Sequence, residues 1–247
     1  MTCGRCEAGV AAALAAAGIQ DFKVNLSAQR VTVRTALGAE AAREAVEGTG
    51  KVAVLVGSGN LAAAVAELGR EGDPAGPGPR GVVRLTQLAG GRCLVEGTVD
   101  GLSPGAHGLA IHETGDTSAG CASLGGHYNP RSSRHGSPDS TERHAGDLGN
   151  ITAGLDGRAR FRLVQPVLQI WEVIGRSVVV ASGRDDLGLG AEPGSGRDGN
   201  CGPGVACGVI ARSAGLGQNN KKICACDGVT IWDERNKPLT GPGRRES

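Results

Sequence analysis

The chain has 247 residues and a formal net charge of +1; 43 residues are glycine and only 2% are aromatic. The near-neutral charge argues against nucleic-acid binding, which needs many cations to neutralise phosphates. No apolar run reaches the roughly 18 residues that cross a bilayer, and the N-terminus lacks the pattern of a signal peptide. We therefore expect no nucleic-acid partner, no stable membrane insertion and no secretory export.

The first part of the chain alternates helical and extended patterns. Residues 7–17 are strong helix formers with Val10 and Leu14 four apart, and Gly18 follows as a helix-ending glycine. The next segments predict strands at 22–26 and 30–35, a helix at 39–48 and a strand at 51–56. With one more strand in front, this order would be the ferredoxin-like βαββαβ unit.

After a short linker at 57–60 the pattern changes to short strands separated by turn signals, which predicts an antiparallel sandwich or barrel. The strand candidates are 62–68, 81–88, 93–102, 108–113, 157–164 and 176–182. Two stretches, 115–150 and 183–204, are rich in Gly, Pro and polar residues, and loops of that length are usually functional. From Ser213 onward the chain is polar and basic, as in a tail that does not pack by itself.

Two pairs of closely spaced cysteines lie near opposite ends of the chain, Cys3 with Cys6 and Cys224 with Cys226. In a reducing compartment such pairs favour metal or redox chemistry over structural disulfides. Cys3 and Cys6 precede a helix, whose N-terminus favours thiolates. Two soft thiolates suit Cu(I), whereas a structural zinc would want four ligands. A thioredoxin-type redox pair or half of a zinc site stays open on these residues alone.

The order "MTCGRC", helix, strand, strand, helix, strand resembles the heavy-metal-associated domain of small copper chaperones. The resemblance implies that Cys3 and Cys6 bind Cu(I). Members of that family have a strand that runs into the motif, whereas Met1 begins the motif here. We therefore expect the first strand of this domain to be missing from the chain, either because the sequence is truncated or because the domain is incomplete.

A histidine-rich loop provides a second candidate metal site. His127, His135, His144 and Asp147 follow the spacing H-x7-H-x8-H-x2-D within a Gly- and Pro-rich segment. Three imidazoles and one carboxylate make a tetrahedral zinc set. Ordering such a loop costs conformational entropy that a bound metal would offset. The alternative is a group of exposed loop histidines.

Several motifs, including "HGLAIHETGDTSAGC", "GGHYNP", "RHAGDLGNITA" and "ACGVIA", resemble copper/zinc superoxide dismutase over about residues 62–212. The resemblance implies an eight-stranded Greek-key barrel. It also implies that the histidine-loop residues are zinc ligands and that Cys121 and Cys207 form a disulfide.

The same resemblance implies that the copper site is incomplete. His112 and His127 match two of the family's four copper histidines, but Ala110 and Ala181 occupy the other two positions. Gly204 stands where the family has the arginine that guides superoxide. Methyl groups cannot ligate copper, so we expect a barrel that keeps its zinc and lacks dismutase chemistry.

The tail sequence "KKICACDGVTIWDER" contains the second thiol pair. Cys224 and Cys226 form a CxC motif, which is strained as an internal disulfide but suited to capturing Cu(I) or to thiol–disulfide exchange. Lys221 and Lys222 would help to keep a thiolate. A chance pair of cysteines in a tail is the simpler alternative.

The order of the three parts resembles the family of copper chaperones for superoxide dismutase. It implies a Cu(I)-binding domain at 1–57, a target-docking barrel at 61–212 and a copper-transfer tail at 213–247. By this resemblance the chain delivers Cu(I) to copper/zinc superoxide dismutase as a heterodimer and promotes its disulfide through Cys224 and Cys226, and it is not itself a dismutase.

Two other functions stay open: a divergent superoxide dismutase and a passive copper or zinc buffer. A homodimer is a second option for the assembly. We expect a cytoplasmic protein, with the nucleus and the mitochondrial intermembrane space as further compartments. The remaining cysteines, Cys93 and Cys201, are expected to be a buried thiol and a loop thiol.

Overall fold

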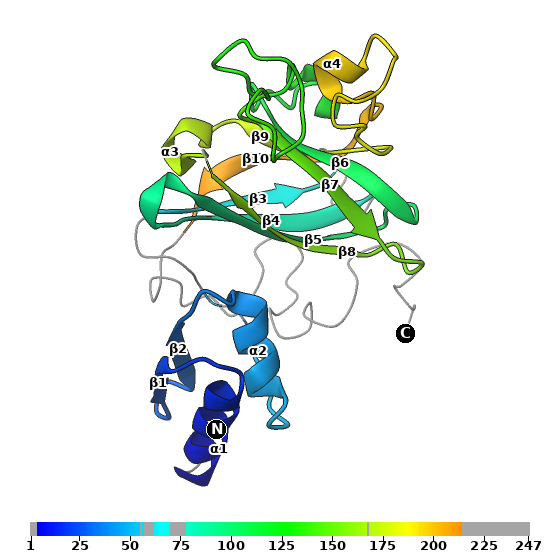
Figure 1. Cartoon of the computed structure of the whole chain (residues 1–247). Helices are drawn as coiled ribbons and strands as arrows, with labels where there is room; N and C mark the ends of the chain where they lie inside the picture. Colours follow the sequence, from blue (N-terminus) through cyan, green and yellow to red (C-terminus); the bar gives the residue numbers. More distant parts are fainter. Residues whose placement is uncertain (1–3, 55, 57–61, 70–77, 167, 214–247) are drawn as a thin grey trace.

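In a computed structural model of the chain, the described residues are 4–54, 56, 62–69, 78–166 and 168–213 (Figure 1). The linker predicted at 57–60 lies outside this part of the chain. So do Cys3 and the tail that carries Cys224 and Cys226. What was predicted for those segments stays a prediction.

The N-terminal unit contains two helices and one hairpin: α1 (Gly4–Ala16), β1 (Asp21–Asn25), β2 (Arg30–Arg34) and α2 (Ala39–Glu47). Gly18 adopts a φ of +80° after α1, and the amide of Ile19 donates to the carbonyl of Leu14, which closes the helix end as the sequence predicted. The helices and the hairpin bury a small core that consists of Val10, Leu14, Ile19, Ala42 and Val46.

Two predictions for this unit were wrong. First, α1 begins at Gly4, so Cys6 lies in the first helical turn and not ahead of the helix. Second, residues 51–54 form no strand. In the ferredoxin-like unit the first and last strands are neighbours, and among the described residues β1 and β2 pair only with each other. Among the described residues no strand pairs with the 51–54 backbone, and the amide of Ala53 donates to the Glu47 side chain instead.

The second unit is a closed antiparallel barrel with the strand order β10-β3-β4-β5-β8-β7-β6-β9. The neighbours β5–β8 and β6–β9 are far apart in sequence, as in a Greek-key barrel. The eight-stranded architecture is confirmed. Its strands are β3 (Ala63–Leu68), β4 (Arg80–Gln87), β5 (Cys93–Asp100), β6 (Gly105–His112), β7 (Asp147–Ala153), β8 (Ala159–Gln165), β9 (Ser177–Ala181) and β10 (Gly204–Arg212).

Strand periodicity found six of these eight strands and missed β7 and β10. The first three residues of β7, Asp147 to Gly149, are all buried, so burial alternates only over the last few residues, and the strand begins within the stretch predicted as a long loop. In β10 the glycines hide the pattern. A side chain at Gly208 would collide with the carbonyl of Glu67 on β3, so this close approach of two strands requires glycine.

The barrel interior is filled by aliphatic side chains such as Val83, Leu85, Ile111, Val180 and Ile210, all fully buried. The loops that follow β6 and β9 gather at one end of this packed barrel, together with the short helix α4 (Ser195–Asp198) (Figure 1). Three further short elements are η1 (Ala89–Gly91), η2 (Gly120–Ser123) and α3 (Ile170–Val173). The rigid barrel thus supports two long loops, which carry the candidate site.

Candidate metal centre

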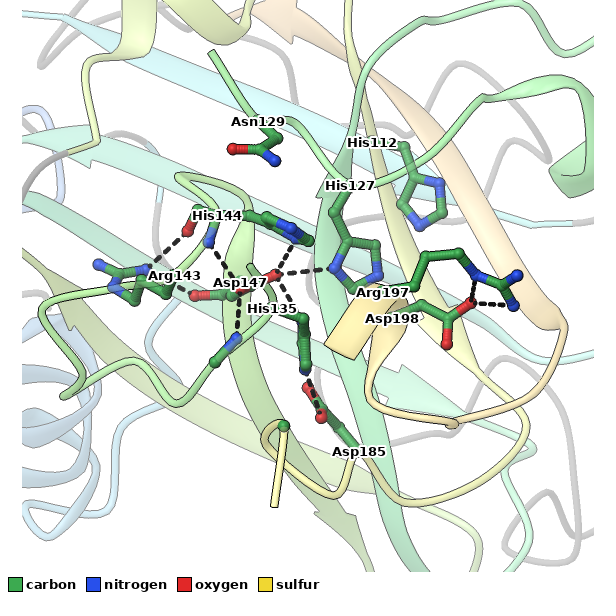
Figure 2. A network of polar contacts seen from close by, with 12 residues as sticks. His112, His127, Asn129, His135, Arg143, His144, Asp147, Asp185, Arg197 and Asp198 are labelled. Atoms are coloured by element: carbon green, nitrogen blue, oxygen red, sulfur yellow. Dashed lines mark hydrogen bonds and ion pairs between the residues drawn. The ribbon is translucent and has the colours of Figure 1, made fainter. Parts of the chain in front are cut away.

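The structure brings the four predicted zinc ligands together. Their ligand atoms, from His127, His135, His144 and Asp147, all lie within 4.8 Å of one another, and all four residues are at least nine-tenths buried (Figure 2). Asp147 opens β7, and the three histidines lie in the loop between β6 and β7. A barrel strand therefore supplies the carboxylate, and the loop before it supplies the three imidazoles.

Three imidazole nitrogens converge on a single oxygen. The Nδ1 atoms of His127, His135 and His144 lie 2.7, 3.0 and 3.1 Å from Asp147 Oδ1. A carboxylate oxygen offers about two lone-pair sites, so it cannot satisfy three donors. The geometry at His135 Nδ1 forms no hydrogen bond, and this buried nitrogen has no other partner among the described residues. Nitrogen lone pairs and a carboxylate around one point are the donor set that a zinc ion requires.

The backbone fixes the other oxygen of the same carboxylate. Asp147 Oδ2 accepts the amides of Gly136 at 3.1 Å and His144 at 2.8 Å. Oδ1 is therefore left facing the three histidines. Arg143 donates from Nη1 to the carbonyl of Asp147 at 2.8 Å, which holds the ligand's main chain from the other side.

A second carboxylate orients one of the ligands. His135 Nε2 lies 2.8 Å from Asp185 Oδ1, in the loop that follows β9. Asn150 on β7 holds Asp185 in place by accepting its amide and donating to its carbonyl. Once His135 has lost its second proton, Nε2–H donates to Asp185 and the Nδ1 lone pair points at the cluster, as a metal ligand needs.

The charges of the cluster are strongly coupled. Burial would raise the pKa of Asp147, but the contacts with His127, His135 and His144 outweigh it and hold that pKa well below its usual range. Burial opposes protonation of His135, yet Asp147 and Asp185 together raise its pKa to about 9. The metal-free cluster thus retains a proton that a cation would replace.

Beside this cluster lies a cavity of about 250 Å³ where the family's copper would sit. His112, His127, Ala110 and Ala181 all line it, and the rings of His112 and His127 lie 5.1 Å apart. His112 Nδ1 contacts the carbonyl of Gly125 at 2.9 Å. Burial and the neighbouring His127 lower the pKa of His112 to about 4, so the ring is neutral at physiological pH. The two methyl groups leave two imidazoles where four would be needed.

His107 is a structural residue. It is buried, and its two ring nitrogens lie 2.9 Å from the carbonyl of Ala181 and 2.8 Å from that of Ser103. This side chain therefore ties β6 to the end of β9 and does not reach the metal cluster.

The long loop is also joined to the barrel covalently. Cys121 and Cys207 form a disulfide across 86 positions of the sequence. Gly204 packs against this bridge, since a Cβ atom there would lie 2.9 Å from Cys121 Cβ and 2.8 Å from Val179 Cγ1. Position 204, where the family has the arginine that guides superoxide, therefore has no room for a side chain unless Val179 and Cys121 move.

The two remaining described thiols in the barrel, Cys93 and Cys201, are both buried. Cys93 is buried at the start of β5, and burial raises its pKa to about 12. Cys201 lies in the loop before β10, where burial, followed by Asp185, raises its pKa to about 11. The predictions of a buried thiol and a loop thiol are confirmed, although the loop thiol is buried as well.

The fold and the four-residue cluster define a barrel of the copper/zinc superoxide dismutase class. The family model for copper/zinc superoxide dismutase matches residues 79–210, and the family model for the heavy-metal-associated domain matches residues 1–51. A crystal structure of the clock protein EA4 superposes on this chain with a TM-score of 0.56 and 37% sequence identity. The superposition covers 65% of this chain and 98% of EA4.

Relatives that match along most of the chain identify the family within this class. The chain is 51% identical over 254 residues to the copper chaperone for superoxide dismutase of Homo sapiens, which spans all of this chain and 90% of the relative. It is 39% identical over 221 residues to the chloroplastic chaperone of Oryza sativa, with 87% of this chain and 62% of that relative covered. The chain belongs to the family of copper chaperones for superoxide dismutase. Within its described residues, no helix is long and apolar enough to cross a membrane.

Proposed function

We propose that this protein delivers Cu(I) to copper/zinc superoxide dismutase and has no dismutase activity of its own. The observation that carries the proposal is the pairing of a complete zinc-type cluster with a cavity lined by Ala110 and Ala181. The barrel has kept the residues that order its long loop and has methyl groups where redox copper would need ligands. A passive metal buffer would need no barrel of this shape.

Zinc in this proposal is a structural ion. His127, His135 and His144 would coordinate it through Nδ1, and Asp147 would coordinate it through Oδ1. A bound zinc would supply the positive charge that relieves the convergence of these four groups. Arg143 and Asp185 would keep the ligands oriented, so that the loop presents one fixed surface.

Copper is cargo, and the thiols at the two ends of the chain would carry it. Cys6 lies half-buried in the first turn of α1, where the helix N-terminus favours a thiolate. With Cys3 it would take up Cu(I) as a bis-thiolate. Cys224 and Cys226 would then pass the ion to the target. If they form a disulfide, the same pair would accept two electrons from two thiols of the target, which become the target's disulfide as the tail is reduced.

Docking would use the side of the barrel that is built from α3, β9 and β10. Trp171 on α3 is 64% exposed, and Val209 on β10 is 38% exposed. Gly115 packs closely against Val209 and the carbonyl of Gly175, which leaves no room for a side chain at this position. Arg176 stacks 4.0 Å over the ring of Tyr128 and donates to the carbonyl of Glu113, which braces the loop beneath. A barrel that copies its target can copy one half of a two-fold interface.

The test is copper transfer. The full chain, loaded with Cu(I), is incubated with zinc-loaded, copper-free and disulfide-reduced superoxide dismutase in the presence of a Cu(I) chelator, and dismutase activity is measured. The proposal expects activation that is sharply reduced by the double substitution Cys224→Ser with Cys226→Ser. Normal activation by that variant would shift transfer to Cys3 and Cys6. No activation by the wild-type chain would favour a buffer, and activity of the chain alone would favour an enzyme.

The proposed compartment is the cytoplasm, because close pairs of thiols suit a reducing environment. The domain ends at 57, 61 and 212 stay predictions, since the family matches stop at residue 51 and resume at residue 79.

A further inference from the structure

A second cavity, of about 420 Å³, opens between the loop at 131–145 and the end of β8. Its apolar lining includes Pro138, Val164 and Pro166, and its polar lining includes two arginines, Arg131 and Arg143. The function proposed above uses Arg143 only for its contacts with the metal cluster and gives this cavity no role.

Arg143 is a buried cation whose hydrogen bonds all go to neutral groups. Its side chain belongs to a residue that is 8% exposed. Nη1 donates to the carbonyls of His144 and Asp147, and Nη2 donates to Gln165 Oε1 at 3.2 Å. A guanidinium has five N–H donors. The Nε–H and one Nη2 hydrogen therefore have no acceptor among the described residues.

Among the described residues no carboxylate forms an ion pair with Arg143: burial lowers its pKa, and Asp147 and Asp139 favour the charged form only from beyond ion-pair distance. The Asp147 carboxylate is occupied by the three histidines and by two backbone amides. Asp139 lines the same cavity, but it is exposed and makes no ion pair with either arginine in the described part of the chain. Arg131 adds a second positive charge at the mouth. Buried arginines are normally paired with an anion, because an uncompensated buried charge is costly.

We propose that this cavity binds a small oxyanion, with Arg143 at its base and Arg131 at its mouth. The lining carries two positive charges and one exposed negative charge, which leaves the cavity net positive. The planar fork of a guanidinium matches two oxygens of one phosphate or carboxylate group, so the two unused donors of Arg143 suit an oxyanion better than a single-atom halide.

The site is coupled to the metal cluster through Arg143. The same guanidinium that would hold the anion donates to the main-chain carbonyls of His144 and Asp147, two of the four candidate ligands. An anion that fixes Arg143 would therefore stabilise the loop that presents those ligands. By linkage, zinc and the anion would each strengthen the binding of the other.

Inorganic phosphate is the probe for the test. The full chain, loaded with zinc, is titrated with phosphate by calorimetry, with chloride at equal ionic strength as the reference. We expect one saturable site for phosphate and none for chloride. Arg131→Gln should weaken phosphate binding by about tenfold, the loss of one charge-assisted contact. The matched control Arg134→Gln removes an exposed arginine of the same loop that does not line the cavity, and it should leave binding unchanged.

A second variant keeps the test decisive if Arg143 itself cannot be replaced. Gln165→Glu places a carboxylate beside Nη2 of Arg143 and supplies the missing counter-charge from within the fold. Phosphate binding should then be lost while the zinc content, measured after the titration, stays at the wild-type level. Phosphate binding that persists in Gln165→Glu, that weakens equally in Arg134→Gln, or that is absent from the wild-type chain would overturn the proposal.

Discussion

His135 Nε2 lies 2.8 Å from Asp185 Oδ1, and this contact joins the loop after β6 to the loop after β9. Both partners are buried, and Asn150 on the barrel holds the Asp185 backbone from beneath. The orientation of a candidate ligand in one loop thus depends on a carboxylate in the other. Zinc affinity should respond to a residue that never touches the ion.

Asp185→Asn should weaken zinc binding by about 10- to 100-fold, the usual effect of removing a carboxylate that orients a ligand. Asparagine has the same size as aspartate, and its side-chain oxygen can still accept the amide of Leu187. It removes only the negative charge that faces His135. The measurement is competition with a chromophoric chelator. Glu192→Gln, an exposed change in the same loop, is the control and should have no effect. Equal affinities for all three proteins would remove Asp185 from this role.

Zinc uptake should release protons. In the metal-free cluster the pKa of His135 is raised to about 9, so the ring is protonated at pH 7.5 and must lose its proton to become a ligand. Calorimetry in buffers of different ionisation enthalpy should therefore report the release of about one proton at pH 7.5 and less above pH 9. His135→Ala should abolish zinc binding. Unchanged zinc content in that variant would refute the ligand assignment.

The raised pKa of His135 also predicts how the stability of the metal-free chain changes with pH. The folded pKa of about 9 exceeds the value of 6.5 for an unperturbed histidine. The contribution of protonated His135 to stability is therefore complete below pH 6.5 and is lost as the pH rises through about 9. The denaturant midpoint of the metal-free chain should therefore decrease as the pH rises from 6.5 to about 9. His135→Ala should make the midpoint less dependent on pH over that range.

Much of this fold was readable from the sequence because its signals are local. The apolar spacing of Val10 and Leu14 and the glycine at 18 fixed the first helix, and the alternation in β1 and β2 fixed the hairpin. The segment at 51–56 has equally good strand chemistry, but its residues 51–54 form no strand, because pairing depends on a neighbour that local patterns do not describe. β7 was missed because it begins inside a Gly- and polar-rich stretch, and its alternation is confined to its last few residues.

The candidate site divides in a similar way. Ligand spacing pointed to the four-residue cluster, because chelating side chains are rare and their order carries information. Asp185 and Gln165 carried no such signal, since one lies 50 positions from His135 and the other lies 22 positions from Arg143. The resemblance located the missing copper ligands, but only the structure showed that Gly204 has no room for a side chain.

Cys207→Ser should lower the free energy of unfolding by about 2–4 kcal/mol, because the bridge to Cys121 closes a long loop. The loop spans 86 positions and carries all four candidate zinc ligands. Denaturant midpoints of the zinc-loaded variant and the parent, measured without reductant, test this expectation. Cys201→Ala leaves the bridge intact and should cost less. Equal midpoints for Cys207→Ser and the parent would show that the bridge contributes nothing to stability.

Trp171→Ala should weaken the proposed complex with superoxide dismutase by roughly 30-fold or more, as expected when an aromatic anchor is removed from an interface centre. Sedimentation with the purified target measures the complex, and the copper-transfer assay measures its consequence. Leu155→Ala is the matched control, since Leu155 is 91% exposed in the turn between β7 and β8. Should Leu155→Ala weaken the complex while Trp171→Ala does not, docking would use a different side of the barrel.

Restoring two histidines should rebuild a copper site. Ala110 and His112 share one face of β6, and Ala110 lies opposite Val179 on β9, so Ala181 is its diagonal neighbour on the same face. All these positions except Val179 were expected from the resemblance, and all line the 250 Å³ cavity. The double variant Ala110→His with Ala181→His would place four imidazoles around that space. We expect it to bind Cu(II) with a tetragonal spectroscopic signature that the parent lacks.

The single change Ala122→His is the control for this variant, because it adds an imidazole in exposed η2 outside the cavity and should give no such signature. Dismutase activity of the double variant should stay low, since no cation at position 204 attracts superoxide. Adding Gly204→Arg requires Val179 and Cys121 to shift, so any gain in rate should come with a loss of stability and should be largest at low salt, where steering is least screened. A parent chain that binds Cu(II) tightly and dismutates superoxide would refute both the incomplete copper site and the chaperone function that rests on it.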